Sequence, residues 1–406
     1  MYFAGAPGIR FWNGPRPGLQ FPQSNVPLPR IVGDNVPLGS VFDQGDSMVG
    51  TRELCWGSNV YRPGLYGSWY WPSSRDNNLT RQIDWYLQNQ PDWVIFCNDR
   101  ATVFQEFFYS NKALVTLNIQ NPAVRAYQLS VVAPHIAEGH QCIAFDNVDL
   151  PNNGASSSMR RAGVWIGATF DQDGVRVPGT GTWQQLYAGV SNDPAYSDAL
   201  IDYIGWFRRQ VNFLGAALMI NGSYLPTDMD RMRRLQQSCD IWLTENAPAH
   251  GDNVDLTNSA TSSRWSLFYD AVVPYTLNGG VWFNSQQFIG TNFAAVPQRE
   301  KAWMVANFLL MRGERSYFSA DQSSTYRTYD STWLPQVGYP AEQPHRVGNT
   351  WQRRYTNGYV YVHPYNPGTE TVTVPAGSWK DQFGTVVAPG DRTMTAKTGL
   401  VLVAQP

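Results

Sequence analysis

Two acidic side chains follow short apolar runs and could perform acid–base chemistry. Asp146 directly follows the run CIAF (142–145), and Glu245 follows the run IWL (241–243) after one threonine. Short apolar runs between polar residues are typical of buried strands in a parallel sheet. The carboxyl ends of such strands form the edge where barrel enzymes place their chemistry. The sequence therefore predicts that Asp146 and Glu245 meet over one cavity.

Two carboxylates across a cavity are what the cleavage of a glycosidic bond requires. One attacks or stabilises the anomeric carbon, and the other protonates the departing oxygen. An acid that keeps its proton near neutral pH needs hydrophobic or anionic surroundings, and Trp242 lies close to Glu245 in the sequence. We therefore predict Asp146 as the nucleophile and Glu245 as the general acid/base of a retaining mechanism, with the reverse roles still open.

Further residues near the predicted strand ends, together with two tryptophans, are candidates for holding a sugar. Amides and carboxylates hydrogen-bond hydroxyl groups, and rings stack on the C–H faces of sugars. Each of these residues could instead be structural, as a turn, a tie to the backbone or part of the core. The predicted substrate-binding residues are Asn147, Asp149, Asn221, Asn284, Asp321, Trp69, Trp183 and Trp242.

Other kinds of site have no motif in the sequence. The histidines show no paired spacing and the four cysteines lie far apart, so we expect no metal site. No Gly-x-Ser-x-Gly motif is present, which argues against a serine hydrolase. No glycine-rich loop follows a predicted strand, which argues against a dinucleotide site. We expect no cofactor.

The composition favours a neutral, hydroxyl-rich ligand. There are 30 basic and 32 acidic residues, so the net charge is -2, which argues against nucleic acid or an anionic membrane as partner. Charged residues make up 15% of the chain and aromatic residues 14%. A surface rich in aromatic and uncharged polar groups suits a polysaccharide or oligosaccharide. An aromatic-rich core is the alternative explanation.

The order of predicted elements indicates a (β/α)8 TIM barrel followed by a small antiparallel β-sandwich. Apolar runs and amphipathic segments alternate, as in a parallel α/β fold, and an open doubly wound sheet is the alternative. From residue 355 the period becomes two, with frequent turns. We predict strands at 91–97, 114–119, 141–150, 216–220, 240–243, 279–283 and 316–318, helices at 79–88, 123–137, 195–213, 228–237, 262–275 and 298–312, and a hairpin within 151–194.

Three regions are predicted along the chain. Residues 1–50 are rich in Pro and Gly and form a plating loop or an attachment arm, residues 51–339 form the barrel, and residues 340–406 form the sandwich. The arm could join a virion or a homo-oligomer. The sequence contains no run of about 18 apolar residues, so we expect no membrane span. The N-terminus lacks the layout of a signal peptide, so we expect a cytoplasmic or virion-associated protein, or one exported by another route.

Several stretches resemble hypothetical glycoside hydrolases with a TIM-barrel fold and, more distantly, the α-galactosaminidase-like families. They are LNIQNPAVRAYQ (117–128), IAFDNVDLPNNGA (143–155), LMINGSY (218–224) and DIWLTENAP (240–248). The resemblance covers roughly residues 85–406, includes a C-terminal β-sandwich, and implies that Asp146 and Glu245 are the catalytic carboxylates. The first 80 residues depart from the pattern. A barrel that binds glycan without cutting it, such as a phage tail or surface component, and a purely architectural particle protein remain alternatives.

Overall fold

The structure is a computed structural model of the 406-residue chain. It describes residues 68–76, 78, 80–107, 114–222, 228–245, 260–287, 296–313, 316–321, 332, 335–364 and 368–405. The chain divides into two compact units, which contain Trp69–Asp240 (unit 1) and Ile241–Pro406 (unit 2). The predicted arm at 1–50 lies outside the described residues.

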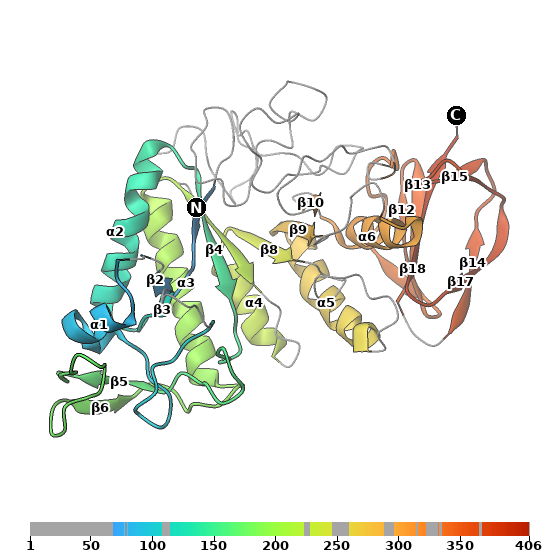
Figure 1. Ribbon diagram of the computed structural model, residues 1–406. Helices are drawn as coiled ribbons and strands as arrows, with labels where there is room; N and C mark the ends of the chain where they lie inside the picture. Colours follow the sequence, from blue (N-terminus) through green and yellow to red (C-terminus); the bar gives the residue numbers. More distant parts are fainter. Residues whose placement is uncertain are drawn as a thin grey trace. The chain divides into compact units, whose positions relative to one another are not determined.

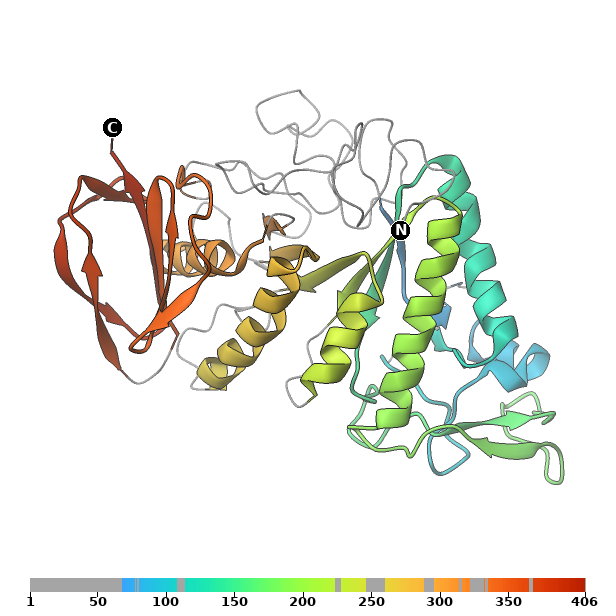
Figure 2. The same cartoon turned by 180° about the vertical axis from the view of Figure 1, so that it is seen from behind.

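Unit 1 is built around the parallel strands β4 and β7. These strands pair in register from Cys142↔Ala217 to Phe145↔Ile220, and β1 is the other neighbour of β4. Helices α2 and α3 run side by side (Figure 1; Figure 2). The elements are β1 (Ser68–Trp71), β2 (Arg75–Asp76), α1 (Ile83–Asn89), a 3-10 turn (Pro91–Trp93), β3 (Val115–Thr116), α2 (Pro122–Glu138), β4 (Cys142–Val148), β5 (Gly163–Ile166), β6 (Thr182–Gln185), α3 (Pro194–Phe213), β7 (Ala217–Gly222) and α4 (Met229–Gln237).

Local signals in the sequence fix the ends of α2 and α3. Each helix begins with a proline at its first position, where no backbone N–H is needed. The side chains of Asn121 and Asp193 accept hydrogen bonds from the backbone N–H groups of Ala123 and Ala195, which caps the helices. Helix α2 ends at Gly139, whose φ of 115° lies in the left-handed region.

The core of unit 1 packs aromatic rings and also contains the buried carboxylate of Asp240. Phe145 of β4 packs against Tyr203 and Phe207 of α3, and all three are fully buried. Asp240 is also fully buried. It accepts hydrogen bonds from Arg208 Nε at 2.8 Å, from Asn212 Nδ2 at 2.8 Å and from a backbone N–H of β7 at 2.9 Å. These bonds tie α3 and β7 to the end of unit 1.

Unit 2 has a parallel part and an antiparallel part. Strands β8, β9 and β10 pair in parallel. The second part contains a six-stranded sheet, ordered β11-β12-β13-β18-β15-β16, and the antiparallel pair β14–β17. The elements are β8 (Ile241–Glu245), α5 (Ala260–Leu277), β9 (Val281–Gln287), α6 (Gln298–Met311), β10 (Ser316–Asp321), β11 (His345–Val347), β12 (Thr350–Tyr355), β13 (Gly358–His363), β14 (Thr369–Val374), β15 (Trp379–Asp381), β16 (Val386–Val387), β17 (Gly390–Thr395) and β18 (Thr398–Ala404).

Helix α6 packs closely on the antiparallel strands. The phenol of Tyr355 donates to the Leu309 carbonyl at 2.6 Å. A Cβ at Gly399 of β18 would lie 2.5 Å from the Cβ of Ala306 and 2.6 Å from the Ala302 carbonyl oxygen. Only glycine permits this approach of strand and helix.

The predicted alternation of parallel strands and helices is confirmed, and so are the C-terminal antiparallel strands. The described strands do not close into an eight-stranded barrel. The strand predicted at 91–97 is a 3-10 turn followed by isolated bridges, and β3 pairs with β2 in antiparallel fashion. An apolar run of four residues does not distinguish a strand from another buried segment. None of the described helices is long and apolar enough to cross a membrane.

Candidate functional site

Asp146 lies on an irregularity of strand β4. The pairing with β7 is regular up to Phe145 and resumes at Val148, so Asp146 and Asn147 form a bulge. Asn147 has a φ of 53°, in the left-handed region that asparagine tolerates better than most residues. Bulges re-aim side chains and recur beside active sites. The bulge therefore places Asp146 where the regular alternation of the strand is broken.

Three donors hold the half-buried carboxylate of Asp146. Oδ2 accepts from the Tyr70 hydroxyl at 3.0 Å. Oδ1 accepts from Asn221 Nδ2 at 3.0 Å and from the Asn147 backbone N–H at 2.9 Å. Because an ionised carboxylate offers about four acceptor positions, these bonds orient the group and leave about one position open. The structure thus brings together three predicted site residues, Asp146, Asn147 and Asn221.

Tyr70 was not among the predicted site residues, and the alternation of β1 explains its role. Trp69 stacks on His135 of α2, with ring centroids 3.4 Å apart. Trp71 is on the same side of the strand and donates from Nε1 to Gln128 of α2. Neighbouring residues of a strand face opposite sides, so Tyr70 faces Asp146. Trp69, which we predicted to hold a sugar, packs against a helix.

A buried charge cluster was also not foreseen from the sequence. Glu106 Oε2 lies 3.3 Å from Arg75 Nε and 3.3 Å from Arg161 Nη2. The side chains are 5%, 1% and 2% exposed, respectively. Burial raises the pKa of the Glu106 carboxyl, while the two guanidiniums oppose that rise. The sequence offered no local signal because the three residues come from separate segments.

Asp149 joins this cluster to the end of β4. Its charge acts on Glu106, Arg161 and Tyr196. The Arg161 guanidinium lies 4.3 Å from the ring centroid of Tyr196, and burial raises the pKa of the Tyr196 hydroxyl. Asp149 is half-buried and lies three residues beyond Asp146, so the same strand end carries both carboxylates.

Glu245 and Asp321 end two parallel strands of unit 2, as predicted. Glu245 is the last residue of β8 and its backbone is in register with Ser285. Asp321 is the last residue of β10, in register with Gln287. The side chains of both acids lie outside the described part of the chain, so their roles remain predictions.

Three other predicted sugar-binding residues make structural contacts. Trp242 is fully buried and packs against aromatic rings of α5, so it belongs to the core of unit 2. Asn284 is 1% exposed and donates to Thr244 Oγ1 at 3.2 Å. Trp183 lies in the hairpin β5–β6 and packs edge-on against Trp165. For Trp242 and Asn284, burial leaves no surface for a sugar, which corrects the prediction.

The described residues contain no cluster of three or more His, Cys, Asp or Glu side chains arranged to hold a metal ion. Cys97, Cys142 and Cys239 are buried free thiols.

Sequence comparison finds no matching protein family model and no matching curated protein. Solved structures that match include glycoside hydrolases and a glucosyl transfer enzyme, all at low similarity. An α-glucosyl transfer enzyme has a TM-score of 0.46 at 11% identity, covering 84% of this chain and 83% of its own. A GH31 dextranase from Flavobacterium johnsoniae has a TM-score of 0.46 at 9% identity, covering 95% and 52%.

A GH27 β-L-arabinopyranosidase from Geobacillus stearothermophilus has a TM-score of 0.42 at 11% identity, covering 78% of this chain and 67% of its own. Scores and identities this low carry no argument about activity. The function is therefore argued from this chain's own residues.

Proposed function

We propose that the protein is a glycoside hydrolase that acts on a polysaccharide or glycoconjugate, with Asp146 as its nucleophile. The supporting observation is the environment of Asp146. The carboxylate lies on a bulge at the carboxyl end of a buried parallel strand and accepts hydrogen bonds from Tyr70, Asn221 and the Asn147 backbone. A strained backbone that aims a half-buried, oriented carboxylate is a feature of reactive sites.

The surrounding donors suit a nucleophile better than an acid. Tyr70, Asn221 and the Asn147 backbone N–H all donate to the carboxylate, so they orient both oxygens for attack on an anomeric carbon. In the first step a bond forms between an Asp146 oxygen and that carbon, and the bond to the leaving oxygen breaks as a general acid protonates it. In the second step water attacks the anomeric carbon and the bond to the Asp146 oxygen breaks. The water gives its proton to the residue that acted as the general acid in the first step.

Glu245 is our proposed general acid/base. This assignment rests on its position as the last residue of the parallel strand β8, since catalytic groups of barrel enzymes lie at the carboxyl ends of parallel strands. Asp149 is the proposed carboxylate for a sugar hydroxyl, since it is half-buried and follows Asp146 on the same strand end.

The experiment that tests the proposal is a search for released sugar. The full chain is incubated with neutral and acidic bacterial and plant polysaccharides, and mass spectrometry reads the products. Asp146→Asn should abolish release. Asp230→Asn is the matched control, because the Asp230 side chain is 90% exposed on α4 and we propose no catalytic or binding role for it. Release by Asp146→Asn at the parent rate would disprove the assignment.

A second experiment separates the two carboxylate roles. In Asp146→Gly, added azide can attack the anomeric carbon from the vacated side, and the product is a glycosyl azide of inverted configuration. In Glu245→Gln, loss of acid–base assistance should cost about 10²–10⁴-fold in kcat for substrates with poor leaving groups, and much less for activated aryl glycosides. Binding of a polysaccharide without any release would instead favour the alternative of a non-catalytic glycan-binding protein.

A further inference from the structure

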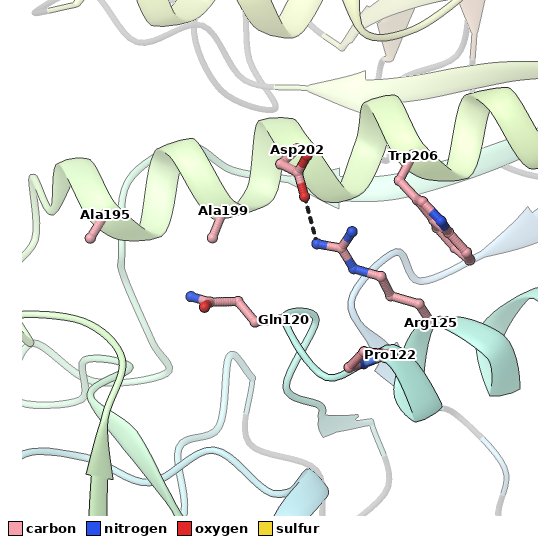
Figure 3. A pocket seen from close by; sticks show the side chains of 7 residues that line it. All are labelled: Gln120, Pro122, Arg125, Ala195, Ala199, Asp202 and Trp206. Carbon is pink, nitrogen blue, oxygen red and sulfur yellow. Dashed lines mark hydrogen bonds and ion pairs between the residues drawn. The ribbon is translucent and has the colours of Figure 1, made fainter.

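A hollow of about 520 Å3 lies between helices α2 and α3, a size within the range of about 300–1,000 Å3 typical of ligand sites. We call it the α2–α3 hollow (Figure 3). None of its lining residues is among the groups that hold Asp146. It is lined by Gln120, Pro122, Arg125, Ala195, Ala199, Asp202 and Trp206.

The helical spacing of α3 creates the hollow. Residues 195, 199, 202 and 206 recur at intervals of three or four, so they share one face of the helix. The first two are alanines, whose methyl groups leave space above the backbone. The last is Trp206, whose ring stands at the other end of the row (Figure 3). The two alanines therefore form the floor of the hollow, and the Trp206 ring forms an aromatic wall at one end of it.

An ion pair with no net charge lies across the hollow. Arg125 Nη2 of α2 donates to Asp202 Oδ2 of α3 at 2.7 Å, and Arg125 Nε donates to the Ile119 carbonyl at 2.6 Å. The Arg125 guanidinium also lies 5.7 Å from the centre of the Trp206 ring. These contacts fix one donor group and one acceptor group in place with no net charge.

The hollow is poorly suited to an anion, although two helices begin beside it. The N-terminal N–H groups of Ala123 and Ala195 are already bound by the side chains of Asn121 and Asp193. The charge of Asp202 offsets that of Arg125. A helix N-terminus attracts anions through its free N–H groups, and here capping side chains occupy N–H groups at both helix starts.

We propose that the α2–α3 hollow binds one or two neutral sugar units of a glycan, at a site separate from Asp146. Trp206 offers a ring for the C–H face of a sugar. Arg125 and Asp202 offer a donor and an acceptor for neighbouring hydroxyls, and Gln120 offers both. This inference does not depend on the proposed hydrolysis, because the site can bind glycan whether or not Asp146 cleaves it.

Affinity electrophoresis in gels that contain dextran, amylopectin, galactomannan or arabinoxylan, with polygalacturonate as the acidic probe, tests the proposal. Asp146→Asn serves as the starting protein so that no probe is consumed. At least one neutral probe should retard it. Trp206→Ala and Ala199→Phe should each weaken that retardation about tenfold or more, since one removes the aromatic wall and the other fills the floor.

Ala126→Phe is the matched control for the filling variant, because Ala126 is an exposed alanine of α2 that does not line the hollow. Its retardation should equal that of the starting protein, and circular dichroism melting should show all variants folded. Three outcomes would overturn the proposal: no retardation by any neutral probe, retardation by polygalacturonate alone, or equal retardation of Trp206→Ala, Ala199→Phe and Ala126→Phe. Loss of hydrolysis in Asp146→Asn has no bearing on this result.

Discussion

Removal of one oxygen atom from Tyr70 tests whether the donors around Asp146 serve chemistry. In Tyr70→Phe, Asp146 Oδ2 loses its 3.0 Å hydrogen bond and the ring remains. A hydrogen bond to a charged group contributes about 1.5–3 kcal/mol, and the half-buried setting favours the lower end. Because about 1.4 kcal/mol corresponds to a tenfold change in rate, we expect kcat/KM to fall about tenfold.

Tyr127→Phe is the matched control for this change. The Tyr127 hydroxyl donates to Asp76 Oδ2 at 2.8 Å, so the same atom is removed from a bond to the same kind of acceptor. This variant should lose about 1.5 kcal/mol of the free energy of unfolding, measured by urea denaturation, and keep its kcat/KM. Both rates are measured on the polysaccharide that the parent protein cleaves. Equal kcat/KM in the parent and Tyr70→Phe, or an equal drop in both variants, would refute the reasoning.

Two further predictions concern stability in unit 1. In Glu106→Leu, the buried guanidiniums of Arg75 and Arg161 lose their counter-charge, so the free energy of unfolding should fall by about 3–5 kcal/mol in urea denaturation, and a loss below about 1 kcal/mol would contradict the cluster's role. In Asp198→Asn, the effect depends on pH, because hydrogen bonds from Arg231 lower the pKa of Asp198. A lowered carboxyl pKa stabilises the fold above its unfolded value of about 3.9 and stops doing so as pH falls through the folded pKa. The stability difference from the parent should therefore shrink between pH 7 and pH 3, and a constant difference would contradict this account.

The helices could be predicted from the sequence because their signals are local. Prolines at the first position, side-chain caps at Asn121 and Asp193, and Gly139 after α2 all lie within a few residues of the helix ends. The predicted range for α2 is one residue short at both ends, and the predicted range for α3 is one residue short at its start. The run at 91–97 gave no such signal, since it forms only isolated bridges, to Val103, Leu117 and Gly163, and two of these partners are distant in the sequence.

The site could be predicted only where it follows a strand end. Asp146 and Asn221 each close a buried apolar run, and the sequence shows this directly. Tyr70 reaches Asp146 across a gap of 76 positions, and which side of β1 faces β4 depends on pairing that no short window reveals. The prediction for Trp242 was wrong for a related reason. The sequence around a tryptophan near a strand end does not show whether its ring faces a cavity or the core, and Trp242 is fully buried.

The full burial of α6 has a practical consequence for anyone who shortens this protein. Every side chain from Lys301 to Met311 is buried, and the sheet partners Arg353 and Tyr355 hydrogen-bond to the carbonyls of Leu310 and Leu309. A truncation before β11 would strip this cover and present an apolar helix to water. Fragments that end near residue 340 should consequently form inclusion bodies, and limited proteolysis of the full chain should not cut within α6.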